Sequence, residues 1–259
     1  MPEFSGLRSP DRRIMVVTGH YGSGKTEFCV SLAMRLARMG YGPYKKLALI
    51  DLDIANPYFR SRERKAQLEA AGVSVYGNAY EHEITAELPA LGANIRAPLE
   101  DKDCRVIVDV GGNDTGALVL NQFAKYLGPE EALFLIVVNA NRPETRDLEG
   151  TLEHLQAIER KTGRRIDGVI NNCHMLLETQ AADIEKGHKL CERFCEATGL
   201  TIALSQERDF STPPQGFFLA LGFVLNWLSL RGSCLGLSGF LSLWNSQIFP
   251  LCAVSLLKG

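Results

Sequence analysis

Apolar and polar positions follow one repeating pattern from Arg13 to about Leu204, where short β-branched runs alternate with longer stretches of helical period. Several of the short runs are apolar throughout, as strands buried on both faces of a sheet should be. Such alternation predicts repeated βαβ units around a parallel sheet. The predicted strands are Ile14–Thr18, Lys46–Asp51, Val73–Tyr76, Arg105–Val110, Ala132–Asn139, Ile166–Asn171 and Gly199–Leu204.

Three segments between these strands have the apolar spacing of helices. The first is Lys25–Met39, which Gly40 is expected to end because glycine commonly closes a helix. The second is Glu144–Arg160, which places a row of apolar side chains on one face, at Leu148, Leu152, Leu155 and Ile158. The third is Glu178–Thr198. The predicted fold class is therefore α/β, with a doubly wound, mostly parallel sheet flanked by helices.

The pattern changes abruptly after residue 209. Residues 210–259 contain only two charged side chains, Arg231 and Lys258, and both tryptophans of the chain. The uncharged runs Phe210–Leu230 and Gly232–Leu257 are long enough to cross a bilayer, although their glycines weaken a helix. Three interpretations of this apolar tail stay open: a non-native extension from a shifted reading frame, a membrane attachment, and a buried extension or dimer surface.

Charge and composition narrow the setting but name no partner. The net charge of −2 and the pI near 6.2 give no global attraction to nucleic acid or anionic lipid, so no nucleic acid is expected. The start of the chain lacks the apolar core of a secretory signal, and the odd number of cysteines favours reduced thiols. We expect a cytoplasmic protein with a loose leader (1–12), one domain (13–209) and the tail (210–259), through which membrane contact would occur.

The strongest chemical signal is a phosphate-binding loop. Gly19, Gly24, Lys25 and Thr26 match the pattern G-x-x-x-x-G-K-[ST], directly after one predicted strand and before one predicted helix. Glycines let backbone N–H groups surround a phosphate, and the new helix adds its positive dipole end. Lys25 is expected to reach the β- and γ-phosphates, and Thr26 to bind Mg²⁺. The expected nucleotide-binding residues of the loop are Gly19, His20, Tyr21, Gly22, Ser23, Gly24, Lys25, Thr26 and Glu27.

Carboxylates at the ends of two other strands complete the expected site. Asp109 closes the strand VIVD and is the candidate Walker B residue for Mg²⁺. Gly112, just after it, is expected to bring a backbone N–H to the γ-phosphate. Asp51 and Asp53 close another strand, where Asp51 is a candidate for the metal shell and Asp53 for orienting the attacking water. The predicted catalytic set is thus Lys25, Asp53 and Asp109.

With these motifs in order, the chain resembles the MinD/ParA-like branch of P-loop ATPases, the CobQ/CobB/MinD/ParA nucleotide-binding domain, over residues 13–205. The resemblance rests on TGHYGSGKTEF, DLD, VIVDVGGNDTG and a late strand leading into INNCH. More narrowly, DLDIANPYFRSRE and VVNANRPET are similar to an uncharacterised bacterial set within that branch. The resemblance implies a switch I role for Asp53, a switch II role for Asp109, and Asn171 or Asn172 near the adenine. It also implies a dimer across the nucleotide.

One position departs from the family pattern. Members that hydrolyse ATP as sandwich dimers carry a lysine after the first glycine of the loop, and this chain has His20 there. A histidine is shorter than lysine and is mostly neutral at pH 7, so it is a poor substitute for a charge reaching across a dimer. The sequence thus predicts a slow Mg²⁺-dependent ATPase that acts as a nucleotide switch on an unknown protein partner. ATP is preferred to GTP because of the resemblance and because the chain lacks an [NT]KxD guanine motif.

Three other functions remain open. A GTP-dependent metal-delivery protein would use His188, Cys191 and Cys195, spaced along one predicted helix, with Cys173 and His174 upstream. A binding module that uses ATP only to choose partners would hydrolyse it at close to the uncatalysed rate. A small-molecule kinase would use the same loop, although no acceptor site is readable.

Overall fold

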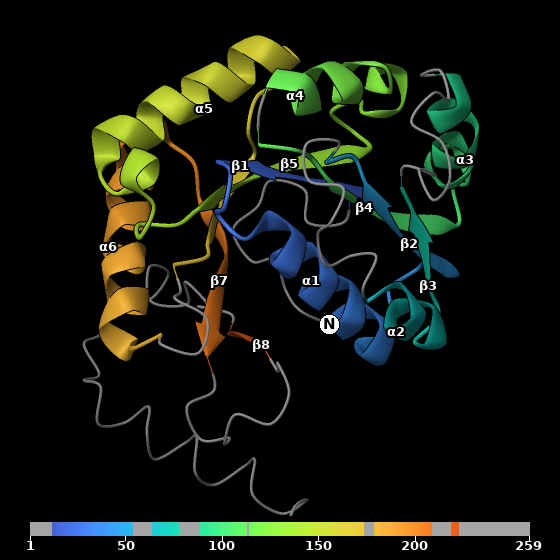
Figure 1. Ribbon diagram of the computed structural model, residues 1–259, viewed down its shortest axis with the longest axis horizontal. Coiled ribbons are helices and arrows are strands. Elements are labelled where there is room, and N and C mark those ends of the chain that lie inside the picture. Colours follow the sequence, from blue (N-terminus) through green and yellow to red (C-terminus); the bar gives the residue numbers. More distant parts are fainter. Residues whose placement is uncertain are drawn as a thin grey trace, which may run out of the picture. The chain divides into compact units, whose positions relative to one another are not determined.

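The computed structural model describes residues 12–53, 64–77, 89–112, 114–173, 179–208 and 219–222. All of them belong to the first of two compact units, residues 1–224; the second, 225–259, lies outside the described residues. The described strands form an eight-stranded sheet of order β3-β2-β4-β1-β5-β6-β7-β8 (Figure 1). All neighbouring strands are parallel except β7 and β8. This order confirms the predicted doubly wound, mostly parallel α/β sheet.

The elements follow one another as strand and helix along most of the chain. The strands are β1 (Ile14–Gly19), β2 (Lys46–Asp51), β3 (Val73–Tyr76), β4 (Cys104–Asp109), β5 (Ala132–Val138), β6 (Gly168–Asn171), β7 (Ile202–Arg208) and β8 (Leu219–Gly222). The α-helices are α1 (Lys25–Met39), α2 (Lys65–Ala70), α3 (Pro89–Glu100), α4 (Asp114–Asn121), α5 (Leu148–Thr162) and α6 (Ala181–Thr198). Two 3₁₀ turns, η1 (Ala124–Tyr126) and η2 (Pro143–Thr145), follow α4 and precede α5.

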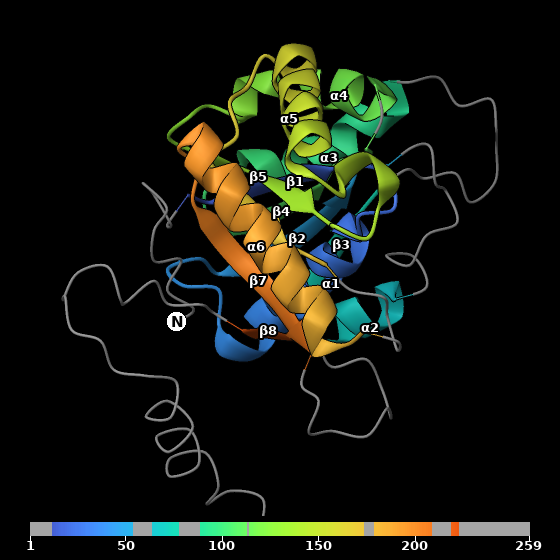
Figure 2. The same ribbon diagram turned by 90° about the vertical axis from the view of Figure 1, so that its left-hand side faces the viewer.

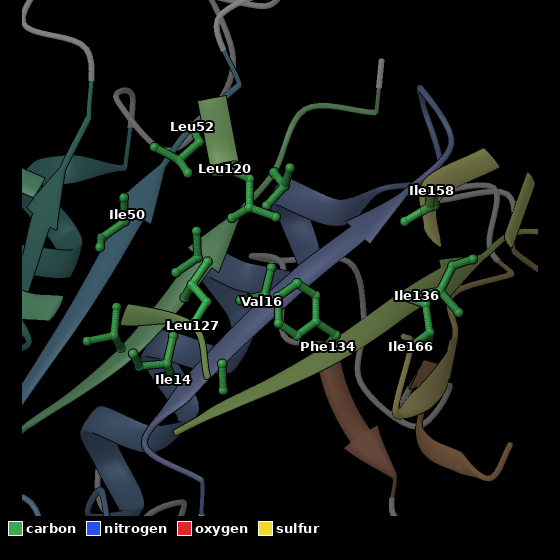
Figure 3. Close-up of a cluster of buried hydrophobic side chains, with 14 of the residues drawn as sticks. Ile14, Val16, Ile50, Leu52, Leu120, Leu127, Phe134, Ile136, Ile158 and Ile166 are labelled. Carbon is green, nitrogen blue, oxygen red and sulfur yellow. The ribbon is translucent and has the colours of Figure 1, made fainter. Parts of the chain in front are cut away.

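Alternate residues of each central strand face opposite sides of the sheet, and each side has its own core. Ile14 and Val16 of β1 face the core covered by α3, α4, α5 and α6, which Figure 3 shows. Met15 and Val17 face the core covered by α1 and α2. Figure 2 shows α3, α4 and α5 on one side of the sheet and α1 and α2 on the other. β1 is therefore packed on both faces, and the loop that follows it starts from a well-packed strand.

The helix and strand boundaries agree best where the hydrophobic pattern is strong. β2, β3 and α1 begin and end where predicted. The second predicted helix begins later, at Leu148 rather than Glu144, because Pro143–Thr145 forms a 3₁₀ turn and Asp147 caps the helix by accepting the Gly150 N–H at 3.0 Å. Its predicted apolar face is confirmed, since Leu155 and Ile158 are buried and Leu148 and Leu152 pack against them.

Three predicted element starts were wrong in the later part of the domain. Gly199 does not start a strand; with φ of 74° it caps the C-terminus of α6, and β7 begins at Ile202. α6 begins at Ala181 rather than Glu178, because Gln180 and Asp183 form a capping box there. β6 likewise begins at Gly168 rather than Ile166, and α2, α3 and α4 were not predicted.

Little of the predicted tail is described. Within residues 210–259, only Leu219–Gly222 is described; it forms β8 and pairs antiparallel with β7. Across the described ranges, no helix combines the length and the apolar character needed to cross a bilayer. Residues 1–11 and the rest of the tail lie outside the described residues, so the predicted domain boundaries stay predictions.

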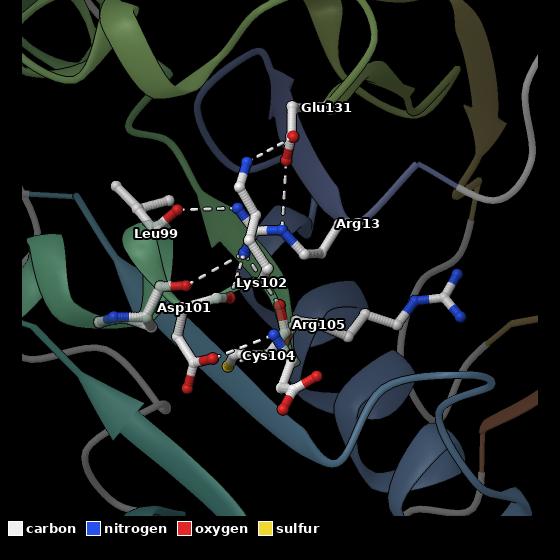
Figure 4. Close-up of polar contacts among 9 residues, drawn as sticks. Arg13, Leu99, Asp101, Lys102, Cys104, Arg105 and Glu131 are labelled. Atoms are coloured by element: carbon white, nitrogen blue, oxygen red, sulfur yellow. Dashed lines mark hydrogen bonds and ion pairs between the residues drawn. The ribbon is translucent and has the colours of Figure 1, made fainter.

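The amino ends of the central strands meet at a network around Arg13, which Figure 4 shows; we call this the amino edge. Arg13 is 5% exposed, and its Nε contacts the Glu131 carboxylate at 3.3 Å. Its other guanidinium nitrogens donate at 2.7 to 3.1 Å to the carbonyl oxygens of Pro98, Leu99, Asp101 and Cys104. These bonds tie β1 to the end of α3 and the start of β4, at the side of the sheet opposite the predicted phosphate loop.

Candidate nucleotide-binding site

The loop from Gly19 to Thr26 leaves the carboxyl end of β1, near the middle of the sheet, and enters α1 directly. A hydrogen bond of 3.1 Å from the Ser23 N–H to the His20 carbonyl oxygen closes its turn. Gly24 stands at the N-cap of α1 with φ of 86°, a left-handed conformation that glycine adopts without strain. The loop therefore passes without a break into the N-terminus of α1, with its unpaired N–H groups and positive dipole end.

Lys25 supplies the positive charge of the loop. Its Nζ donates to the carbonyl oxygen of His20 at 3.1 Å, and the residue is only 5% exposed. Ser23 and Glu27 are buried beside it, whereas Tyr21 is 59% exposed at the tip of the loop. A buried ammonium within a glycine-rich turn at a helix N-terminus can bind an anion such as phosphate.

Asp109 is the most unusual residue of the site. It ends β4, where its register partners are Val17 of β1 on one side and Asp51 of β2 on the other. It is 1% exposed, and neither carboxylate oxygen has a hydrogen-bond partner of normal geometry among the described residues. Burial, followed by the negative charge of Asp51, raises the pKa of Asp109 to about 7, against the opposing effects of Lys25 and the Thr26 hydroxyl.

These residues fit a Mg²⁺ ion that also takes phosphate and water ligands. A buried carboxylate without a partner, beside the Thr26 hydroxyl, offers the oxygen ligands that Mg²⁺ prefers. In the described part of the chain, no group of three His, Cys, Asp or Glu side chains could hold a metal by itself. Mg²⁺ commonly takes only one or two protein ligands together with phosphate and water, so the predicted ligands Thr26, Asp109 and Asp51 stay a prediction.

Asp51 and Asp53 lie at the end of β2, next to Asp109 along the sheet edge. Asp51 Oδ1 accepts the backbone N–H of Asp53 at 3.0 Å, so one oxygen of Asp51 holds the turn that follows the strand. Leu52 continues the ladder by donating its N–H to the Asp109 carbonyl oxygen at 2.9 Å. The backbone thus brings the predicted switch I residue Asp53 to the same edge as Asp109.

Gly112 and Asn172 contact the loop from neighbouring strands. A β-carbon on Gly112 would lie 2.7 Å from both the Gly19 carbonyl oxygen and the Tyr21 nitrogen, so only glycine fits there. The Asn172 side chain donates to the Ser23 carbonyl oxygen at 2.7 Å. Asn171 instead packs against α6 and accepts the Cys173 N–H at 3.2 Å, so only Asn172 of the two reaches the loop. A role for either in base binding stays a prediction.

The residues proposed as metal ligands for the alternative function, His188, Cys191 and Cys195, lie on α6 and not at the phosphate loop. His188 contacts Glu192 at 3.4 Å, on the same helix. Cys191 is fully buried, and burial raises the pKa of its thiol far above the ordinary value. Burial also raises the pKa of Cys195, to about 11. Thiols held in the neutral form are poor metal ligands, since the thiolate is the binding species.

Two residues that sequence reasoning missed lie at the loop. His154 of α5 stacks edge-on against His20, with ring centroids 5.2 Å apart, and burial together with the charges of His20 and Lys25 lowers the pKa of His154 to about 4. Arg142, after β5, places its guanidinium carbon 3.2 Å from where a β-carbon on Gly22 would be. The resemblance to the family includes the run VVNANRPET, which contains Arg142. No local sequence pattern indicates that His154 lies at the loop.

Comparisons with known proteins add similarity of fold only. No family model matches the chain, and no curated protein matches it. The signal recognition particle receptor FtsY from Elizabethkingia anophelis superposes with a TM-score of 0.48 and 16% identity, covering 79% of this chain and 61% of that one. The cell division protein FtsY from Thermotoga maritima gives 0.46 and 19%, covering 75% and 61%.

The 54 kDa signal recognition particle protein from Aeropyrum pernix K1, solved in complex with GDP, gives a TM-score of 0.47 and 22% identity, covering 75% of this chain and 41% of that one. The chain thus spans about three fifths or less of the length of these structures. TM-scores below 0.5 assign no family, so the P-loop fold rests on this chain's own strand order and loop geometry.

Proposed function

We propose that this chain binds Mg²⁺-ATP at the phosphate loop and acts as a slow nucleotide switch of the MinD/ParA-like class on a protein partner. The observation that carries the proposal is Asp109, a buried carboxylate beside Lys25 and Thr26 that has no hydrogen bond of normal geometry among the described residues. A buried charge without a partner is costly in a folded protein. A Mg²⁺ ion held between this carboxylate and the phosphates would give the carboxylate a partner of opposite charge.

The proposal assigns a role to each residue of the site. The backbone N–H groups of the loop and Lys25 bind the phosphates, while Thr26 and Asp109 hold Mg²⁺. The ion, when bound, neutralises charge on the phosphate oxygens. Asp51 supports the metal shell through water, and Asp53 orients the attacking water. Gly112, in contact with the loop backbone, makes the segment after β4 sensitive to the terminal phosphate.

ATP rather than GTP is proposed because of the residues at the carboxyl end of β6. A guanine-specific loop of the [NT]KxD type carries an aspartate three residues after its first position. This chain has INNCHM there, with neither the lysine nor the aspartate. The membership of the MinD/ParA-like branch and a homodimer across the nucleotide are parts of the same proposal, supported by the loop, DLD and DVGG motifs.

Binding of ATP and GTP, measured side by side by calorimetry with Mg²⁺, tests the proposal. We expect the wild-type protein to bind ATP more tightly than GTP, and Lys25→Ala to weaken ATP binding about 100-fold, since a charge-assisted phosphate contact is lost. Arg38→Ala, at the far end of α1, is the matched control and should leave the affinity unchanged. Failure of the wild type to bind either nucleotide overturns the proposal. Tighter binding of GTP than of ATP would show that the preferred base is guanine rather than adenine.

Hydrolysis tests the switch and the dimer separately from binding. We expect slow single-turnover hydrolysis of ATP that Asp53→Asn reduces further. A first-order rate that does not change with protein concentration or with His20→Ala would remove the dimer from the mechanism. Tight ATP binding with no turnover above the uncatalysed rate would instead favour the ATP-regulated binding module.

A further inference from the structure

Arg142 lies against the phosphate loop although it is distant from it in sequence. A β-carbon on Gly22 would be 3.2 Å from the guanidinium carbon of Arg142 and 3.4 and 3.5 Å from two of its nitrogens. Gly22 has φ of 72°, so both the conformation and the space at this position favour glycine. The absence of a side chain at Gly22 leaves room for the guanidinium beside the backbone that would surround a phosphate.

The segment that carries Arg142 is fixed by its own hydrogen bonds. The Arg142 N–H donates to the Asn139 carbonyl oxygen at 3.0 Å, and the Arg142 carbonyl accepts the Thr145 N–H at 3.1 Å. The Thr145 hydroxyl also donates to the Asn139 carbonyl oxygen, at 2.9 Å. Asn139 directly follows β5, the strand beside β1, and is 2% exposed. The backbone of Arg142 is therefore held at a set distance from the loop.

The nearby arginine, Arg146, provides a contrast. Arg146 contacts the Asp147 carboxylate at 3.5 Å and lines a surface pocket with Lys186 and Arg193 of α6, away from the loop. Among the described residues, Arg142 forms no ion pair. Its exposed guanidinium thus keeps its donors available for an anion at the loop, and guanidinium groups suit the paired oxygens of a phosphate.

We propose that Arg142 is a second cationic phosphate ligand of the nucleotide site, provided by the same chain. This proposal rests on the proposed nucleotide binding. It gives the loop a positive charge at its tip, where the family pattern has a lysine and this chain has His20. Each chain would then contribute two cations to the phosphates that it binds, Lys25 of the loop and Arg142 beside Gly22.

Calorimetric titration of Arg142→Gln, Arg142→Lys and the matched control Arg146→Gln with Mg²⁺-ATP tests the proposal. We expect Arg142→Gln to weaken ATP binding about tenfold or more, Arg142→Lys to recover part of the loss, and Arg146→Gln to match the wild type. The weakening should also shrink as ionic strength rises, because a charge contact is screened by salt. Thermal unfolding without nucleotide should be the same for all variants.

Separate outcomes distinguish this proposal from the nucleotide site itself. If the wild type binds ATP, Lys25→Ala weakens binding about 100-fold, and Arg142→Gln stays within twofold of Arg146→Gln, then Arg142 has no role and the nucleotide site stands. If Arg142→Lys binds as poorly as Arg142→Gln while unfolding is unchanged, the bidentate geometry of arginine is required, which supports the proposal. If the wild type binds no nucleotide, both proposals fall together.

Discussion

The two ends of the central strands hold buried charges in opposite ways. At the amino edge, the guanidinium of Arg13 is surrounded by four carbonyl oxygens and the Glu131 carboxylate (Figure 4). At the carboxyl edge, where the strands lead into the phosphate loop, the Asp109 carboxylate has no hydrogen bond of normal geometry among the described residues, although the Thr26 hydroxyl lies beside it. Both residues are deeply buried, with exposures of 5% and 1%.

The hydrogen-bonded network of Arg13 stabilises the fold. The Asp109 carboxylate at the other edge is instead a group that a ligand could bind. Four residues at the phosphate loop, Ser23, Asp109, His154 and Asn172, have buried side-chain atoms without a hydrogen bond among the described residues. Such atoms also occur away from the loop, for example on Arg12 and Asn171. Leaving such groups unpaired lowers the free energy of unfolding, whereas the Arg13 network raises it. Variants at the two edges should therefore change stability in opposite directions.

The largest effect is expected at the amino edge. Arg13→Met should lower the free energy of unfolding by about 4 kcal/mol, because it leaves buried carbonyl oxygens and Glu131 without their partner. Urea unfolding followed by circular dichroism measures it. Lys102→Met is the matched control, since Lys102 contacts the same Glu131 carboxylate from an exposed position and should change stability by less than about 0.5 kcal/mol. Equal losses for the two variants would contradict the special role of Arg13.

At the carboxyl edge, a substitution should raise the free energy of unfolding rather than lower it. Asp109→Asn should raise the free energy of unfolding by about 2 kcal/mol at pH 8 without Mg²⁺ or nucleotide, since it removes an unpaired buried charge whose pKa is raised to about 7. The same variant should lose the stabilisation that Mg²⁺-ATP gives the wild type. Asp103→Asn, at an exposed carboxylate, is the control. A destabilised Asp109→Asn would show that this carboxylate supports the fold.

A smaller effect should come from the close approach of Gly112 to the loop. Gly112→Ala places a β-carbon 2.7 Å from the loop backbone, so the loop must shift. We expect ATP affinity to fall about tenfold, or ~1.4 kcal/mol. Gly128→Ala, where an added β-carbon meets nothing within 4 Å, should bind as the wild type does. Unchanged affinity for Gly112→Ala would mean that the loop moves freely.

The smallest effect is a dependence on pH that arises from His154. Because the pKa of His154 is lowered to about 4, the unfolded chain binds its proton more readily, and stability is lost as pH falls from about 6.5 toward 4. Between pH 7 and pH 6 the wild type should lose about 0.7 kcal/mol more than His154→Gln. Parallel urea titrations at the two pH values measure the difference. Parallel losses in the two proteins would show that His154 is exposed to solvent.

Sequence reasoning predicted the parts of the site that local patterns encode. The loop and the strand ends at Asp51 and Asp109 follow from apolar strands that end in polar motifs. The resemblance added Asn171 or Asn172 near the base, and their role in base binding stays a prediction. The sequence does not distinguish Asn171 from Asn172, because the difference lies in which side chain faces α6 and which faces Ser23.

The missed features depend on packing between distant segments. α3 contains Pro98, which argues against a helix locally, yet Ile95 and Leu99 bury against the sheet and hold the helix in place. No local signal marks Arg13 as a buried group, because its partners are carbonyl oxygens of α3 and β4. Arg142 and His154 reach the loop only because β5 pairs with β1.

The pairing of β1 with both β4 and β5 also determines how a ligand would be sensed by the rest of the molecule. Amide protons of Val16 and Val17, in the middle of the sheet, should exchange with solvent only when the whole domain opens. A ligand held at the end of this strand would slow that exchange by the same factor by which it shifts the unfolding equilibrium. Occupancy of the loop would thus be measurable as slower exchange of the most deeply buried amides of the domain.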